Sequence, residues 1–383
     1  MSPLMPARFS VSLLVLSLVA LLSASGIEFY DHGNPSDLEQ LLLERINGTR
    51  ANPAPIGARL GVPIRDPSPR QPLVFHPKLL QAAVAHSEYL IAKGTFSHQG
   101  AGNTNAQQRM AAAGYPFGGG YEGWAENLGL YELLGVTELD ALHRTQDLLF
   151  KSAEHRRWIL EPGFREAGLG ISTGRSPVQG ATRDVIVVTE KFAVSGASPS
   201  TEKDGSFLQG VVYNDVNENG RYDLGEGAPG VNVTPNRGGY YTVTSASGGY
   251  AVPMANHSGP VDVKFTCPGV DHTLSLTMTP NLNAKLDLRL QDHPQPEIEP
   301  ASGEALEDDE TAPDLDAVPL LRIVGVDGNQ LTFEIGEDAS EDELTLQYSA
   351  DLLTWESIPA DLEDTFRASK IGRHGFFRIV PQP

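Results

Sequence analysis

The sequence SAEHRRWILEPGFREAGLGI, residues 152–171, carries the clearest structural signal in the chain. Two shorter motifs precede it, GTFSHQG at 94–100 and GWAENLG at 123–129. Each motif surrounds an ionisable side chain with small or apolar neighbours, and these ionisable residues are His98, Glu126, His155 and Glu166. Because ionisable residues on a solvated surface usually have polar neighbours, the pattern predicts side chains that point into a cleft.

Amphipathic helices are expected around these motifs. Ser36 and Glu39 have the spacing of a capping box, and leucines follow them at helical spacing. The Asn52-Pro53 pair should end this helix. The expected helices span residues 36–50, 77–93, 106–113, 139–151 and 152–160. Residues 51–76, which are rich in Pro, Gly and Arg, are predicted to form a long loop.

The pattern changes after the last of these helices. Gly168–Ser172 and Asp184–Phe192 contain β-branched and apolar residues in short runs, which predicts two strands of a hairpin. Helices followed by short strands predict an α+β fold in which the helices pack on a small antiparallel sheet.

Five motifs in order, FSHQG, QRMAAAGY, AENLG, EHRRWIL and GFREAGLGI, resemble the CAP superfamily in its cysteine-free bacterial form. That superfamily includes cysteine-rich secretory proteins, antigen 5 and pathogenesis-related proteins. The resemblance covers about residues 36–193, which sets the first domain at 27–193. It implies an α-β-α sandwich with a central cavity that two histidines and two acidic residues line in many members.

The resemblance places His98, Glu126 and His155 in this cavity. Its bacterial form carries a glutamate in the GFxExGxG motif, which selects Glu166 as the fourth residue and leaves Glu154 as the reserve. Two imidazoles and two carboxylates suit a divalent ion such as zinc, and they could equally transfer protons.

Residues 1–26 are predicted to form a signal peptide, because Arg8, the apolar run Val11–Leu22 and a small-residue exit follow one another. The apolar run falls below the ~20 residues that span a bilayer, so no stable membrane span is expected after cleavage. The mature protein is then expected to be secreted or at the cell surface. Cys267 is the only cysteine, which excludes an internal disulfide.

The net charge of −21 disfavours nucleic acid as a partner, because binding to phosphates requires clustered Lys and Arg. Residues 27–193 hold 18 acidic and 16 basic residues, so the excess lies in the C-terminal half. Residues 291–317 alone hold ten acidic residues and no Lys or Arg, which predicts a disordered, self-repelling linker.

Residues 194–205 are small and polar and are predicted to form a linker before the sequence DVNENGRYDLGE at 215–226. This sequence matches the calcium pattern D-x-[DN]-x-[DN]-G-x5-E in full. The expected ligands are Asp215, Asn217, Asn219, Arg221 through its backbone carbonyl, Asp223 and Glu226. Glycine and proline after the loop exclude a second helix, and alternating strands follow. Residues 206–290 therefore resemble the B-type repeats of bacterial surface adhesins, in which calcium would stiffen a spacer.

Residues 318–383 are expected to form a second all-β sandwich. The motif Leu346–Trp355, together with the closing GFFRI, resembles the C-terminal fibronectin-like modules of exported bacterial proteins. The predicted architecture is thus an α-β-α sandwich followed by two small β-sandwiches.

Two function hypotheses follow. In the first, a secreted binding module holds a divalent ion and an extracellular ligand (lipid, peptide or glycan) in the His/Glu cavity. In the second, an extracellular hydrolase of the peptidase type uses His98 or His155 as a general base that Glu126 orients, or a metal-bound water. Neither Ser97 nor Ser152 lies in a nucleophile turn of the G-x-S-x-G kind. The first hypothesis is preferred, because a fold alone does not imply a reaction.

Overall fold

The structure is a computed structural model of the whole chain. It describes residues 27–117, 123–178, 180–195, 206–255 and 257–292, and, by backbone alone, strands between residues 321 and 381. The predicted signal peptide and most of both predicted linkers lie outside the described residues. The chain divides into two compact units, Met1–Glu297 and Ile298–Pro383.

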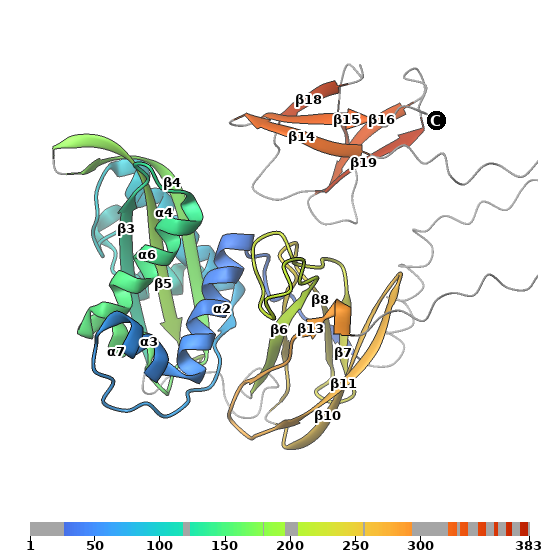
Figure 1. Cartoon of the computed structure of the whole chain (residues 1–383), viewed down its shortest axis with the longest axis horizontal. Coiled ribbons are helices and arrows are strands. Elements are labelled where there is room, and N and C mark those ends of the chain that lie inside the picture. The colour runs from blue at the N-terminus through green and yellow to red at the C-terminus, as the bar shows by residue number, and fades with distance from the viewer. Residues whose placement is uncertain are drawn as a thin grey trace, which may run out of the picture. The chain divides into compact units, whose positions relative to one another are not determined.

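A four-stranded sheet forms the centre of the N-terminal part (Figure 1). Its strands are β2 (Val74–Phe75), β3 (Trp124–Glu132), β4 (Glu166–Val178) and β5 (Ala181–Ala193), in the order β2-β4-β5-β3. Strands β4 and β5 form a continuous antiparallel hairpin, as the sequence predicts, and β3 pairs with β5 antiparallel. The short β2 is parallel to β4. Strand β3 is an addition to the expected elements.

Helices cover both faces of this sheet. They are α2 (Asp37–Ala51), α3 (Pro53–Leu60), α4 (Pro77–Lys93), α5 (Ala106–Ala112), α6 (Glu138–Lys151) and α7 (Ala153–Ile159). One apolar core joins residues of α2, α6 and α7 to Leu169 of β4 and Val188 of β5. On the opposite face, α4 packs against β4 and α5 packs against α4. This α-β-α arrangement is consistent with the expected sandwich.

Two glycines explain how closely α4 approaches the sheet. A Cβ atom on Gly168 would lie 2.0 Å from the backbone carbon of Leu79, and one on Gly170 would lie 2.2 Å from that of Ala83. The G-x-G spacing in residues 152–171 therefore lets helix backbone rest directly on strand backbone, which no larger residue would permit.

The prediction of a long loop over residues 51–76 is wrong in part, because α3 and β2 lie within it. Pro53 occupies the first turn of α3, where its missing N–H costs no hydrogen bond. Gly61 ends the helix in the left-handed conformation, with φ of 68°. Ile56 and Leu60 pack partly buried against the core, so a short segment gains enough apolar contact to be helical.

Residues 206–292 form two further sheets around a second apolar core. The strands are β6 (Phe207–Tyr213), β7 (Asn232–Pro235), β8 (Tyr240–Val243), β9 (Gly249–Pro253), β10 (Gly259–Cys267), β11 (Val270–Met278), β12 (Ala284–Lys285) and β13 (Leu288–Arg289). One sheet holds β12, β6, β13 and β9, and the other has the order β1-β8-β7-β10-β11. The edge strand β1 (Glu28–Phe29) of the second sheet comes from the N-terminal segment and runs parallel to β8.

Polar contacts join the two cores into one compact unit. The Lys285 ammonium lies 2.9 Å from the Glu44 carboxylate on α2. The Asn283 side-chain amide donates to the carbonyls of Pro72 and Arg165, at 2.9 and 2.8 Å. The β-rich region is therefore fastened directly to the helical sandwich.

The C-terminal unit contains β14 (Leu321–Asp327), β15 (Gln330–Ile335), β16 (Leu344–Ser349), β17 (Glu356–Ile358), β18 (Thr365–Ser369) and β19 (Phe376–Pro381). These strands form two antiparallel three-stranded sheets, β14-β15-β18 and β17-β16-β19. Trp355 lies outside the described residues. Within the described part of the chain, no helix is long and apolar enough to cross a membrane.

Candidate functional site

Glu126 is the centre of the charged cluster on the α4 face of the sheet. Strand β3 places it opposite Lys191 on β5, and the Lys191 ammonium forms an ion pair with its Oε2. Arg109 from α5 donates to both carboxylate oxygens, at 2.9 and 2.7 Å. The His98 Nδ1 atom lies 2.9 Å from Oε1. A carboxylate whose side chain is 1 % exposed is thus bound by three partners.

Charge keeps Glu126 ionised in this buried position. Burial alone would raise its pKa, but the hydrogen bond from His98 and the charges of Lys191 and Arg109 outweigh burial and lower the pKa to about 2. Burial lowers the pKa of Lys191 to about 8, although Glu126 opposes this shift. The cluster therefore carries a permanent negative charge at Glu126 and a cation on either side of it.

His98 is oriented by this carboxylate. An ionised carboxylate can only accept, so the Nδ1–H of His98 donates to Glu126. This leaves the Nε2 lone pair of His98 with no partner among the described residues, on a side chain that is 61 % exposed. Arg109 also donates to the His98 carbonyl at 2.9 Å, which fixes the loop. His98 thus offers a free basic nitrogen in a set orientation.

His155 lies near this site, on the short helix α7. Burial lowers its pKa, and the charge of Glu154 opposes this shift. The Asn127 side-chain amide on β3 donates to the His155 backbone carbonyl at 3.2 Å, so α7 lies against the strand that carries Glu126. The buried Nδ1 of His155 has no hydrogen bond partner in the described part of the chain. His155 also lines a pocket of about 520 Å³ whose wall is mostly apolar. Phe96 and Leu148, which line the same pocket, are 50 % and 52 % exposed.

His86 is part of the packing around the site. It is buried on α4, and its Nε2–H donates to the Ser97 carbonyl at 3.1 Å. Burial lowers its pKa to about 4, despite the charge of Glu126. His86 is therefore a neutral histidine at the edge of the core, with a satisfied hydrogen bond.

Glu166 does not join the cluster. Its carboxylate accepts a hydrogen bond from the Tyr115 hydroxyl at 2.5 Å and another from the Ser195 N–H at 2.8 Å. Burial raises its pKa. The reserve residue Glu154 is exposed. The structure therefore brings together His98 and Glu126, places His155 against the strand that carries Glu126, and keeps Glu166 in a separate buried contact.

Residues 43–189 match the family model of the Cysteine-rich secretory protein family, CAP. The chain contains a CAP domain. Among solved structures, it is similar to an outer surface protein from Borrelia burgdorferi, at 18% identity and a TM-score of 0.26, over 40% of this chain and 90% of that one. It is also similar to an extracellular protein containing a SCP domain from Bacillus anthracis, at 17% identity and a TM-score of 0.25, over 40% of this chain and 41% of that one. No curated protein matches the chain.

The arrangement of the His and Glu side chains in the CAP domain limits which of them could be metal ligands. Among the described residues, no group of three or more His, Cys, Asp or Glu side chains is arranged around one point. The two oxygens of Glu126 already accept four hydrogen bonds, which are all that a carboxylate ordinarily accepts. Glu126 therefore orients the His98 imidazole through a hydrogen bond, and its oxygens have no capacity left for an ion.

Two partners of Glu126, Arg109 and Lys191, are not among the residues that the sequence motifs predict for the candidate site. Arg109 lies in the QRMAAAGY motif, so its place in a motif was visible but its partner was not. Lys191 and Glu190 interrupt the apolar sequence VIVVTEKFA of a buried strand. Charged residues inside a buried strand usually have partners, so the sequence itself marks Lys191 and Glu190 as residues with buried polar contacts.

The loop at 215–226 lies outside the CAP match. Asp215 is buried, and its carboxylate accepts from the backbone N–H groups of Asn219 and Gly220, at 3.0 and 2.8 Å. Gly220 has φ of 73°, the conformation that the glycine of a calcium loop supplies at its sharp turn. Arg289 on β13 also contacts Asp215, at 2.9 Å.

The other expected calcium ligands face one another across this loop. The side-chain amides of Asn217 and Asn219 donate to Asp223, at 2.9 and 2.6 Å. Glu226 accepts from the backbone N–H groups of Val216 and Asp223, at 3.0 and 2.8 Å. The side-chain oxygens of Asn217 and Asn219 accept from the backbone N–H groups of Asn219 and Arg221, at 3.1 and 2.8 Å. Among the described residues, the acids of this loop are not gathered around one point as metal ligands would be.

Proposed function

We propose that this protein is an extracellular CAP-domain protein whose His98 and His155 bind a divalent ion, an extracellular ligand, or both. The observation that carries the proposal is the His98–Glu126 pair. A carboxylate kept ionised by Arg109 and Lys191 holds one imidazole so that its Nε2 lone pair stays free at the surface. Such an arrangement binds an electron-poor atom or a hydrogen-bond donor.

The apolar pocket beside His155 supplies the second half of the binding surface. Phe96, Leu128 and Leu148 line it, so an apolar part of the ligand could rest there while a polar part meets His98. A divalent ion, when bound, would polarise an oxygen of that polar part. His98 and His155 would hold the ion, and Glu126 would keep His98 in the required tautomer.

Two features of the sequence support an extracellular place for this function. A signal peptide is expected over residues 1–26, and the loop at 215–226 is proposed to bind calcium, which is plentiful outside cells. The β-rich regions after residue 206, which the sequence relates to surface modules, would display the CAP domain. Calcium in the loop would then have a structural role.

Zinc titration by calorimetry tests the proposal on the full chain. We expect binding in the wild type, loss of binding in His98→Ala and in His155→Ala, and a roughly 10- to 100-fold weaker affinity in Glu126→Gln, because the orienting carboxylate is lost. His272→Ala, on β11, is the matched control. Equal zinc affinity in His98→Ala and the control would refute the two-histidine site.

A hydrolase remains the second candidate, because a buried carboxylate that orients an exposed imidazole is also the geometry of a general base. The hydrolase proposal lacks an identified side-chain nucleophile. The Ser97 hydroxyl accepts from the backbone N–H of Gln99 at 3.1 Å and acts as a turn residue. Incubation with casein and with peptidoglycan fragments decides between the candidates, and equal turnover by wild type and Glu126→Gln would eliminate this one.

A further inference from the structure

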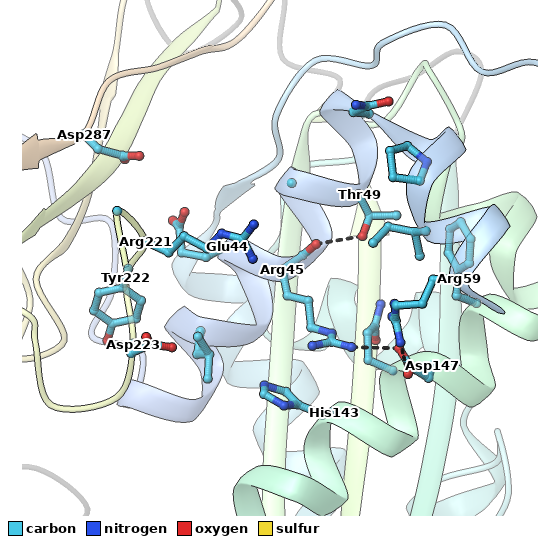
Figure 2. Close-up of a pocket in the computed structure, with 18 of the residues that line it drawn as sticks. Glu44, Arg45, Thr49, Arg59, His143, Asp147, Arg221, Tyr222, Asp223 and Asp287 are labelled. Carbon is cyan, nitrogen blue, oxygen red and sulfur yellow. Dashed lines mark hydrogen bonds and ion pairs between the residues drawn. The ribbon is translucent and has the colours of Figure 1, made fainter. Parts of the chain in front are cut away.

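A cavity of about 780 Å³ lies between the CAP domain and the β-rich region (Figure 2). Helices α2, α3 and α6 form one wall, and the calcium loop with β6 forms the other. It is separate from the His98 site and larger than the pocket beside His155. Pockets of this size between domains are common places for small ligands.

The CAP wall presents guanidinium groups that are already held in position. Asp147 on α6 accepts from Arg45 at 2.7 Å and from both terminal nitrogens of Arg59, each at 2.7 Å. Figure 2 shows the two arginine side chains meeting at this carboxylate. Because a guanidinium carries five N–H donors, each arginine keeps donors for a ligand after binding Asp147.

The opposite wall is the middle of the calcium loop. Arg221, Tyr222 and Asp223 all line the cavity, and Figure 2 shows them on the side facing α2. Tyr222 packs against Leu41 of α2, and its ring centroid lies 6.3 Å from that of Tyr213. Its hydroxyl is enclosed by protein, so the ring of Tyr222, and not its hydroxyl, is what the residue offers to the cavity.

The charged side chains of the cavity wall include no surplus of cations. Arg45, Arg59 and Arg221 face four carboxylates, which belong to Glu44, Asp147, Asp223 and Asp287. Lys285, which does not line the cavity, forms ion pairs with Glu44 and Asp287. His143 also lines the cavity, and burial together with the charge of Arg45 lowers its pKa, which favours the neutral form. An anionic ligand would therefore meet no surplus of positive charge.

We propose that this cavity binds an uncharged saccharide. Sugar hydroxyls both donate and accept, so they can meet the spare N–H donors of Arg45 and Arg59 and the oxygens of carboxylates in the same cavity. Apolar lining residues, among them Leu41, Ile56 and Phe150, suit the C–H faces of a sugar ring.

Calorimetry on the calcium-loaded full chain tests this proposal with chitotetraose, cellotetraose and maltotetraose as neutral probes and trigalacturonate as the acidic one. We expect at least one neutral probe to bind. Arg45→Gln and Arg59→Gln, which each remove a guanidinium from the cavity wall, should each weaken that binding at least about tenfold. Arg175→Gln is the matched control, because its side chain is 71% exposed on β4.

Three results would overturn the proposal. They are the failure of every neutral probe at millimolar concentration, binding of trigalacturonate alone, and binding that Arg45→Gln and Arg59→Gln leave as strong as Arg175→Gln does. The melting temperature of each variant shows whether it is folded, so that a loss of binding is not confused with a loss of structure.

Discussion

Glu190 is a buried acid on the α6 face of the sheet, next in sequence to Lys191 but pointing away from it. The Asn127 side-chain amide donates to it at 2.9 Å, and the same amide lies 3.2 Å from the carbonyl of His155. Burial raises the pKa of Glu190 to about 7, against the hydrogen bonds from Asn127 and Gln146. Lys191 and Glu190 thus lie on opposite faces of one strand. Lys191 contacts the charged cluster around Glu126, and Glu190 is buried against Asn127 on the α6 face.

The raised pKa makes Glu190 a source of pH-dependent stability. Its ordinary value is 4.5, so folding takes up a proton between about pH 4.5 and 7. Its contribution is complete below pH 4.5 and is lost as the pH rises to 7. Between about pH 5 and pH 8, the free energy of unfolding should fall less in Glu190→Gln than in the wild type. We expect the difference between the two decreases to be up to about 3 kcal/mol.

Urea unfolding at the two pH values measures this difference. Glu154→Gln, an exposed change in the same domain, is the control and should keep the wild-type pH dependence. If Glu190→Gln also keeps it, Glu190 is ionised at neutral pH and the burial argument fails.

The sequence does not predict which charged residues are buried or what they contact. Arg50 is fully buried and donates to the carbonyls of Gln71, Ile159, Glu161 and Phe164. Nothing local in the sequence distinguishes it from a solvated arginine at a helix end. Its role depends on segments about 20 and 110 residues away, as the role of Lys191 depends on Glu126.

Individual elements were predictable where local chemistry defines their ends. The Ser36–Glu39 capping box forms as expected at the start of α2, and α4 spans the expected residues 77–93. Strand β3 was missed because a Gly-rich segment precedes it and its pairing partner, β5, lies about 60 residues later. For the candidate site, the motifs proposed His98, Glu126, His155 and Glu166, and the contacts that separate Glu166 from the His98–Glu126 pair depend on tertiary packing.

The loop at residues 215–226 is the element whose proposed ligand, calcium, can be tested directly. Calcium that binds only the folded loop should raise the melting temperature of the full chain, through about 2.7 kcal/mol of added stability at 100 times the dissociation constant. Asp215→Ala should abolish this increase, because Asp215 is the first expected ligand and is buried. Differential scanning calorimetry with calcium and with chelator measures it.

Asp271→Ala is the control for this experiment, since Asp271 is a highly exposed acid on β11 outside the loop. It should respond to calcium as the wild type does. A calcium response that survives in Asp215→Ala would show that the ion acts elsewhere on this acidic protein.

At the scale of the whole molecule, the CAP domain and the β-rich region are joined by more than a linker. The N-terminal segment supplies β1 to the sheet of the β-rich region before the chain enters α2. Asn283 bridges the two regions as well, since its backbone N–H donates to the Gln71 side chain at 3.0 Å. Contacts that alternate between the two cores should make them unfold together.

The Lys285 ion pairs make this expectation testable. Lys285 binds Glu44 of the CAP domain and Asp287 of its own region, and Glu44 is largely buried. Lys285→Met leaves that carboxylate without its cation, which should cost about 3–5 kcal/mol. Adding Glu44→Gln removes the unpaired charge and should restore much of the loss.

Thermal unfolding followed in both regions then distinguishes a joined molecule from a chain of independent domains. In the joined molecule, Lys285→Met lowers the unfolding temperature of the CAP domain and the β-rich region together, as tryptophan fluorescence of Trp124 and Trp158 and far-ultraviolet circular dichroism would both report. Lys264→Met, on the exposed face of β10, is the matched control. A cation that balances a buried carboxylate across an interface should couple the stabilities of the two sides. Two separate transitions, with the CAP transition unchanged in Lys285→Met, would therefore show that the interface contributes little to the stability of either region.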